Sequence, residues 1–88
     1  MRVTTTAAQL ISTLAAKADL PGGGLRIAQQ AEHPGLTMEL APAPRAEDDV
    51  LRRNGVTLYL DRTAAERLQG QVLDARTNES GSAFFLGG

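Results

Sequence analysis

The residues that could do chemistry are few, because the chain of 88 residues contains one histidine and no cysteine. The histidine, His33, precedes Pro34 in a stretch typical of a turn. His33 is the candidate metal ligand, for iron or zinc, although a metal site needs several convergent ligands and a lone histidine in a turn is more often a polar surface residue. Glu32 could assist, but adjacent side chains on an extended chain point apart. The lack of cysteine removes disulfides, thiolate nucleophiles and thiolate sites for zinc or iron–sulfur clusters.

Three other patterns are weaker candidates. The acidic run Glu47, Asp48 and Asp49 could bind a hard cation, but it lacks the ligand spacing of a calcium loop and is typical of a solvated loop. The glycines at 22–24 follow a predicted helix instead of opening one, which indicates a helix stop and not a phosphate cradle. A hydrolase triad would depend on His33, and no serine lies in a Gly-x-Ser-x-Gly context. The sequence therefore predicts no enzyme and no cofactor.

Charge and composition narrow the class of partner. The net charge is −1, so no basic field favours nucleic acid or a membrane surface. No apolar run approaches the roughly 18 residues of a membrane span, and the first residues do not read as a signal peptide. We therefore expect a cytoplasmic protein with one domain, residues 1–88. A core this small is thin, so a homodimer is one expectation.

The first half of the chain predicts a helix and two strands. Apolar residues at helical spacing predict a helix over residues 4–18, with a threonine as its cap. Alternation predicts a half-buried strand over residues 25–29. A turn at residues 32–35 leads into a second alternating strand at 36–40. A loop follows at 41–49, and its charges are expected to lie in water.

The strongest local signal is Asn54-Gly55. Both central positions of a type I′ turn need positive φ, which Asn and Gly tolerate best. The dipeptide therefore predicts a hairpin between strands at residues 50–53 and 56–60. Residues 71–76 predict a further strand and residues 77–81 a turn.

A short helix is predicted directly after this hairpin. Thr63 and Glu66 have the spacing of a capping box, in which the hydroxyl and the carboxylate each accept a hydrogen bond from a free amide. Gly70 is placed to end the helix. Asp61 and Asp74 lie at strand ends, where we expect them to accept hydrogen bonds from backbone amides instead of acting as acid and base.

A last strand is predicted at residues 82–86, and it contains both phenylalanines. Phe84, Phe85 and Leu86 are expected to complete the core. Alternatively they form a subunit contact, because a terminal apolar edge is a natural docking surface.

Together these features resemble the HesB-like domain, the fold of the A-type iron–sulfur carriers, over about residues 5–86. The matching pieces are Thr6-Ala7-Ala8, Gly24-Leu25-Arg26-Ile27, Gly35-Leu36-Thr37-Met38-Glu39-Leu40, Asp49-Val50-Leu51, Asn54-Gly55-Val56 through Asp61, Leu68-Gln69-Gly70 and Val72-Leu73-Asp74. The resemblance implies a β-rich α+β fold with an N-terminal helix, mostly antiparallel or mixed strands in two small sheets, and one short helix.

The resemblance also implies which ligands this chain lacks. The family has a cysteine two residues before the glycine that opens the second strand, and here that position is His33. The other two family cysteines form a Cys-Gly-Cys-Gly tail after the last strand, and the sequence reaches Gly88 without it. Two non-enzymatic hypotheses follow. One is an accessory or protein-interaction module that pairs with itself or with iron–sulfur assembly proteins. The other is an iron or zinc protein that uses His33 and carboxylates, shared across a dimer.

Overall fold

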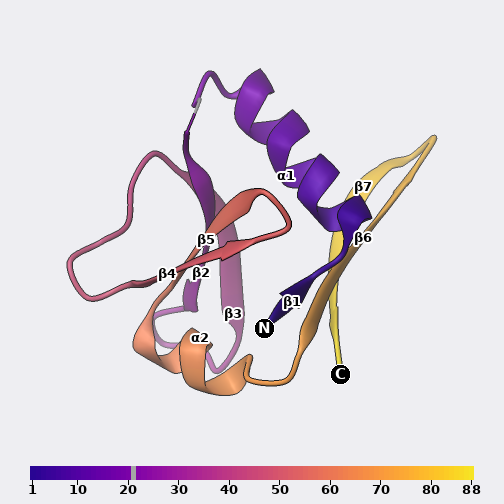
Figure 1. Ribbon diagram of the computed structural model, residues 1–88. Helices are drawn as coiled ribbons and strands as arrows, with labels where there is room; N and C mark the ends of the chain where they lie inside the picture. Colours follow the sequence, from indigo (N-terminus) through magenta and orange to yellow (C-terminus); the bar gives the residue numbers. More distant parts are fainter. Residues whose placement is uncertain (21) are drawn as a thin grey trace.

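The computed structural model describes residues 1–20 and 22–88 (Figure 1). Its helices and strands are, in chain order, β1 (Arg2–Val3), α1 (Thr5–Lys17), β2 (Gly24–Gln29), β3 (Leu36–Ala41), β4 (Asp49–Arg53), β5 (Val56–Leu60), α2 (Arg62–Arg67), β6 (Val72–Asn78) and β7 (Gly81–Gly87). They form a four-stranded sheet with the order β3-β2-β5-β4 and a three-stranded sheet with the order β1-β6-β7. The structure therefore confirms the α+β class with two small sheets.

The four-stranded sheet is mixed and its centre is buried. β2 pairs antiparallel with β3 and parallel with β5, and β4 pairs antiparallel with β5. β5 is buried along its whole length, and β2 is buried from Gly24 to Ala28. The predicted strand at 25–29 is therefore confirmed, but the expectation that it is half-buried was wrong. Alternation did not reveal that the polar member Arg26 is buried too.

Helix α1 connects the two sheets. It packs against β6 of the smaller sheet and against β2 and β5 of the larger one. Ala7 and Ile11 on its inner face are fully buried, and the small alanine lets the helix backbone come close to the strands. Thr4 caps the start, because its side chain accepts a hydrogen bond of 3.1 Å from the amide of Ala7. The predicted helix is confirmed, and Pro21, part of its predicted stop, lies outside the described residues.

The three-stranded sheet contains features that the sequence did not indicate. β1 pairs in parallel with β6 through Arg2 and Val3, and a strand of two residues has no periodicity to detect. The β6–β7 hairpin is also tighter than predicted. Residues 77 and 78 continue β6, and Gly81, with a φ of 135°, already begins β7. The predicted turn at 77–81 was thus too wide, and the loop is two residues long.

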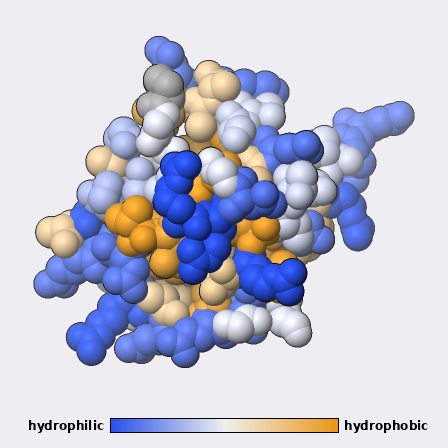
Figure 2. Space-filling view, in the orientation of Figure 1, coloured by the Kyte–Doolittle hydropathy of each residue, from blue (hydrophilic) through white to orange (hydrophobic). Residues whose placement is uncertain are grey.

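The core lies where α1, α2 and both sheets meet. Its largest fully buried side chains are Ile11, Ile27, Leu58, Leu60 and Leu73. On the face shown in Figure 2, hydrophobic residues lie near the middle and are interrupted by hydrophilic ones, which also dominate the periphery. Neither helix in the described part of the chain is long and apolar enough to cross a membrane.

Candidate functional site

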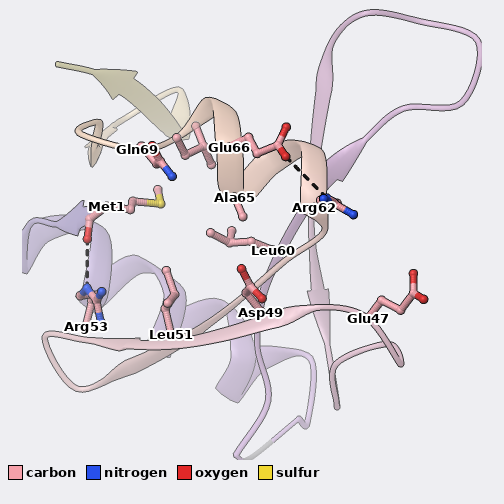
Figure 3. A pocket seen from close by; sticks show the side chains of 11 residues that line it. Met1, Glu47, Asp49, Leu51, Arg53, Leu60, Arg62, Ala65, Glu66 and Gln69 are labelled. Carbon is pink, nitrogen blue, oxygen red and sulfur yellow. Dashed lines mark hydrogen bonds and ion pairs between the residues drawn. The ribbon is translucent and has the colours of Figure 1, made fainter.

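A groove of about 580 Å³ lies between β4, α2 and the first residue (Figure 3). The apolar part of its lining consists of Met1, Leu51, Leu60, Ala65 and Leu68. The first four of these side chains converge on the middle of the groove in Figure 3. A hollow of this size, with an apolar floor, can accept an apolar side chain or a small ligand.

Carboxylates at one end of the groove give it a negative rim. Arg62 and Glu66 on α2 form an exposed ion pair with 3.5 Å between Nε and Oε1, so these two charges offset each other. Glu47, in the loop before β4, and Asp49, at the start of β4, have no ion-pair partner among the described residues. This end of the groove therefore favours a cationic group.

The opposite end of the groove is formed by Arg53. Its Nε donates a hydrogen bond of 3.0 Å to the carbonyl of Met1, and its Nη1 donates one of 2.8 Å to the carbonyl of Arg52. The bond from Nε fastens the first residue of the chain to β4. Because both acceptors are neutral carbonyls, the guanidinium charge is not cancelled, and the groove has a negative end and a positive end.

The Asn54-Gly55 turn holds the β4 wall of the groove in place. The two residues have φ values of 52° and 85°, which confirms the predicted hairpin with two positive φ angles. The Asn54 side-chain amide also donates to the carbonyl of Val3 and to the hydroxyl of Thr5, both at 3.3 Å. The turn therefore also ties β1 and the start of α1 to the hairpin.

Asp61 positions α2 at the other side of the groove. Its carboxylate accepts a hydrogen bond of 2.8 Å from the amide of Ala64 and one of 2.9 Å from the amide of Gln29. The expectation that Asp61 accepts backbone amides is confirmed. The predicted capping box was wrong, because α2 begins at Arg62 and Thr63 lies inside it. Glu66 takes part in the exposed pair on α2 instead of reaching back to the helix start.

Gly70 and Asp74 have the structural roles expected of them. Gly70, with a φ of 74°, lies in the turn after α2. The Asp74 carboxylate accepts hydrogen bonds of 2.7 Å from the Thr4 hydroxyl and 2.8 Å from the amide of Ala75. The Thr4 hydroxyl is the main reason that the pKa of Asp74 is lowered, because its hydrogen bond favours the ionised carboxylate. Asp74 thus links the cap of α1 to β6.

Asp48 forms an ion pair that the sequence did not reveal. Arg26 in β2 donates to Asp48 through Nε at 2.8 Å and through Nη2 at 3.0 Å, and the amide of Arg45 adds a third bond of 2.9 Å. The two side chains are 10% and 3% exposed. The hydrogen bonds from Arg26 lower the pKa of Asp48, against the opposing effect of burial. The prediction that the charges of loop 41–49 lie in water was therefore wrong for Asp48.

His33 lies on the surface, in the turn between β2 and β3. Its backbone amide donates to the carbonyl of Gln30 at 3.3 Å. Arg67 of α2 donates a hydrogen bond through Nη1 to the carbonyl of Pro34, so the turn contacts the helix. No three His, Cys, Asp or Glu side chains of residues 1–20 and 22–88 are grouped as metal ligands would be. Metal binding by His33 therefore stays a prediction.

The glycine run and the triad were the two remaining candidates. Gly22, with a φ of 82°, follows α1, and Gly24 is the first residue of β2. These positions agree with the predicted helix stop and the start of the next strand. Within the part of the chain that the structure describes, no hydrogen bond connects the His33 side chain to a serine or a carboxylate. Neither pattern forms a chemical site there.

Two solved structures with a similar fold are those of the iron–sulfur proteins SufA and IscA. SufA from Escherichia coli, which is involved in the biosynthesis of iron–sulfur clusters, matches with a TM-score of 0.78 and 24% identity over 98% of this chain and 82% of SufA. IscA carrying a [2Fe-2S] cluster matches with a TM-score of 0.70 and 26% identity over 98% of this chain and 79% of IscA. No protein-family model and no curated protein sequence matches.

A third structure extends the likeness to the full chain. A protein from Aquifex aeolicus, determined in solution, matches with a TM-score of 0.78 and 21% identity over 100% of this chain and 90% of its own. The chain therefore has the HesB-like fold that SufA and IscA share. It has this fold in a sequence without cysteine.

The groove itself was not predicted from the sequence. Its lining comes from four separate segments, the first residue, β4, the end of β5 and α2, and no local pattern connects them. The sequence feature that overlaps the groove lining most is Asp49-Val50-Leu51, which the resemblance to the HesB-like domain assigns to the scaffold. Only the folded chain shows that Asp49 and Leu51 lie on the same wall of a groove.

Proposed function

We propose that this protein is a non-enzymatic accessory module of iron–sulfur cluster biogenesis, which binds other proteins instead of carrying a cluster on cysteine. The observation that supports it is the SufA and IscA fold across 98% of a chain with no cysteine in its 88 residues. Cysteine thiolates are the usual ligands of such clusters. The proposal includes a cytoplasmic location, association into a homodimer and an assembly protein as partner.

The groove between β4 and α2 is the surface that suits a partner protein. An apolar side chain of the partner would fill the floor around Leu51 and Leu60, and a neighbouring lysine or arginine would reach Glu47 and Asp49. Apolar anchoring in a pocket supplies most of the affinity of such contacts, and charges at the rim supply steering and specificity. The partner segment is therefore expected to be apolar with a flanking basic residue.

Reversing the charge of Asp49 tests the groove. We expect Asp49→Lys to weaken binding to the assembly protein by about tenfold or more, because the new charge faces the partner's basic residue at an interface. The measurement is calorimetric titration of the purified protein with purified iron–sulfur scaffold and carrier proteins of the same cell. Glu79→Lys, in the exposed turn between β6 and β7, makes the same charge change away from the groove and should leave the affinity unchanged. Equal affinity of both variants and the unaltered protein would reject the groove.

The second candidate function is metal binding through His33. The observation that favours it is the position of this exposed histidine next to Glu32 in the turn between β2 and β3, where the resemblance places a family cysteine. One such turn supplies too few ligands, so the site would need a second chain to contribute the same residues.

Anaerobic incubation with iron and sulfide, and separately with zinc, separates the two functions. The interaction module is expected to remain colourless and free of stoichiometric metal, because imidazole and exposed carboxylates of one turn do not complete a coordination sphere. Absorption spectroscopy and metal analysis give the result. Stoichiometric iron or zinc that is lost in His33→Ala and kept in Gln30→Ala would establish the metal-binding function instead.

A further inference from the structure

Strand β7 is an open edge. It is the last strand of the three-stranded sheet, and its side away from β6 is paired with no strand in the described part of the chain (Figure 1). Every other edge strand carries charge: Arg2 in β1, Glu39 in β3, and Asp49 among others in β4. Charges on an edge discourage pairing with another chain. The seven residues of β7 contain none, so this edge is the one left open to pairing.

The exposed side chains of β7 suit a partner strand. Phe85 is 46% exposed and Leu86 is 37% exposed. Phe85 lies on the same face as Ala83, and the guanidinium carbon of Arg76 lies 5.4 Å from its ring centre. Next to this ring is a hollow of about 340 Å³, whose lining includes the small residues Gly81 and Ala83. An exposed phenyl ring and a hollow over small residues therefore lie side by side on one strand.

We propose that two copies of this chain pair through their β7 strands, antiparallel and around a twofold axis at Phe84. The inference deepens the proposed homodimer and rests on it. The twofold at Phe84 is the arrangement that pairs all seven residues of both strands, Gly81–Gly87, and so gives the longest possible ladder of backbone hydrogen bonds. It joins the two three-stranded sheets into one of six strands.

This register places each exposed apolar side chain opposite a small one. Phe85 of one copy lies opposite the partner's Ala83, and Leu86 lies opposite the partner's Ser82. Residues directly opposite in an antiparallel pair project from the same face of the sheet. The ring of Phe85 therefore enters the hollow above the partner's Ala83, which exists in the single chain. By the twofold symmetry, the same contact is made twice.

A second copy explains more of this surface than an unrelated strand would. Any extended peptide could satisfy the open backbone edge. Only a copy of the same strand brings both a ring and a hollow at the spacing that the register requires, because Phe85 and Ala83 are equally far from the axis at Phe84. Arg76, opposite Ala83 on β6, also comes next to the entering ring, which adds a cation–π contact of the kind it already makes.

The test is the mass in solution, measured by light scattering and sedimentation over micromolar to millimolar concentrations. We expect the unaltered protein to show twice the chain mass at the upper concentrations. Ala83→Lys places a charge in the hollow without touching the core, and it should give the mass of one chain. Val50→Lys is the matched control, because Val50 is an exposed apolar residue, 52% exposed, on the charged edge strand β4, and it should leave the dimer intact. Circular dichroism verifies the fold of each variant.

Each outcome has a definite meaning. A single-chain mass for the unaltered protein at every concentration overturns the β7 pairing together with the proposed homodimer, and leaves the groove and its partner untouched. A dimer that survives Ala83→Lys overturns the β7 surface alone. Loss of the dimer in Val50→Lys overturns it as well, in favour of β4. If Ala83→Lys does not fold, Phe85→Asp repeats the test from the ring side of the same contact.

Discussion

Replacing Asp48 with asparagine is expected to lower the free energy of unfolding by about 3 kcal/mol, because it leaves the guanidinium of Arg26 buried without its counter-charge. The two side chains are 10% and 3% exposed and share two hydrogen bonds. Urea unfolding followed by circular dichroism measures the change. Asp49→Asn is the control, since Asp49 is the exposed neighbour and its substitution should change the free energy by less than about 0.5 kcal/mol. Equal stability of the two variants would contradict the role of the pair.

The same pair predicts a pH dependence with a definite sign. Folding lowers the pKa of Asp48, mainly through the hydrogen bonds from Arg26. The ionised carboxylate therefore stabilises the fold fully above the unfolded pKa of about 3.9, and this contribution is lost as pH falls through the lower folded value. The stability difference between the protein and Asp48→Asn should accordingly be constant near neutral pH and shrink in acid, below about pH 4. Asp74, whose pKa is also lowered, is present in both proteins and cancels from the difference.

The parts of the fold that could be predicted are those in which a local residue type has a local consequence. Asn54-Gly55 predicted its turn because positive φ is a property of those two residues alone. The helix at α1 was predicted because its buried positions recur at helical spacing. Asp61 was expected to accept hydrogen bonds from backbone amides, and it accepts them from Ala64 in α2 and from Gln29 in β2.

The failures have one physical cause, which is partners that lie far apart in the sequence. Arg26 and Asp48 are 22 residues apart, so nothing near Asp48 indicates that its charge is buried. The Thr63–Glu66 spacing satisfies the capping pattern, but Asp61 starts the helix earlier and takes the free amides first. The groove has the same origin, because its walls come from β4 and α2 and its floor includes the first residue of the chain. The likeness to SufA and IscA identifies the scaffold, and the details of the surface depend on such long-range contacts.

Gly24 is expected to be intolerant of alanine, although the sequence indicated only a glycine-rich helix stop. Gly24 is a buried residue at the start of β2, next to β5. A Cβ atom at this position would lie 2.4 Å from the carbonyl oxygen of Thr57 and 3.0 Å from its carbonyl carbon. Because these are backbone atoms of the neighbouring strand, no side-chain rotation can relieve the overlap. The two central strands of the larger sheet would have to separate.

We therefore expect Gly24→Ala to lower the free energy of unfolding by about 3 kcal/mol, the upper range for overpacking a well-packed core. The matched control is Gly35→Ala, because an added Cβ there would meet nothing within 4 Å, and it should change the stability by less than about 0.5 kcal/mol. Urea unfolding gives both values, and hydrogen exchange of the β2 and β5 amides shows whether the strands separate. A Gly24→Ala variant as stable as Gly35→Ala would mean that β2 and β5 do not approach each other this closely.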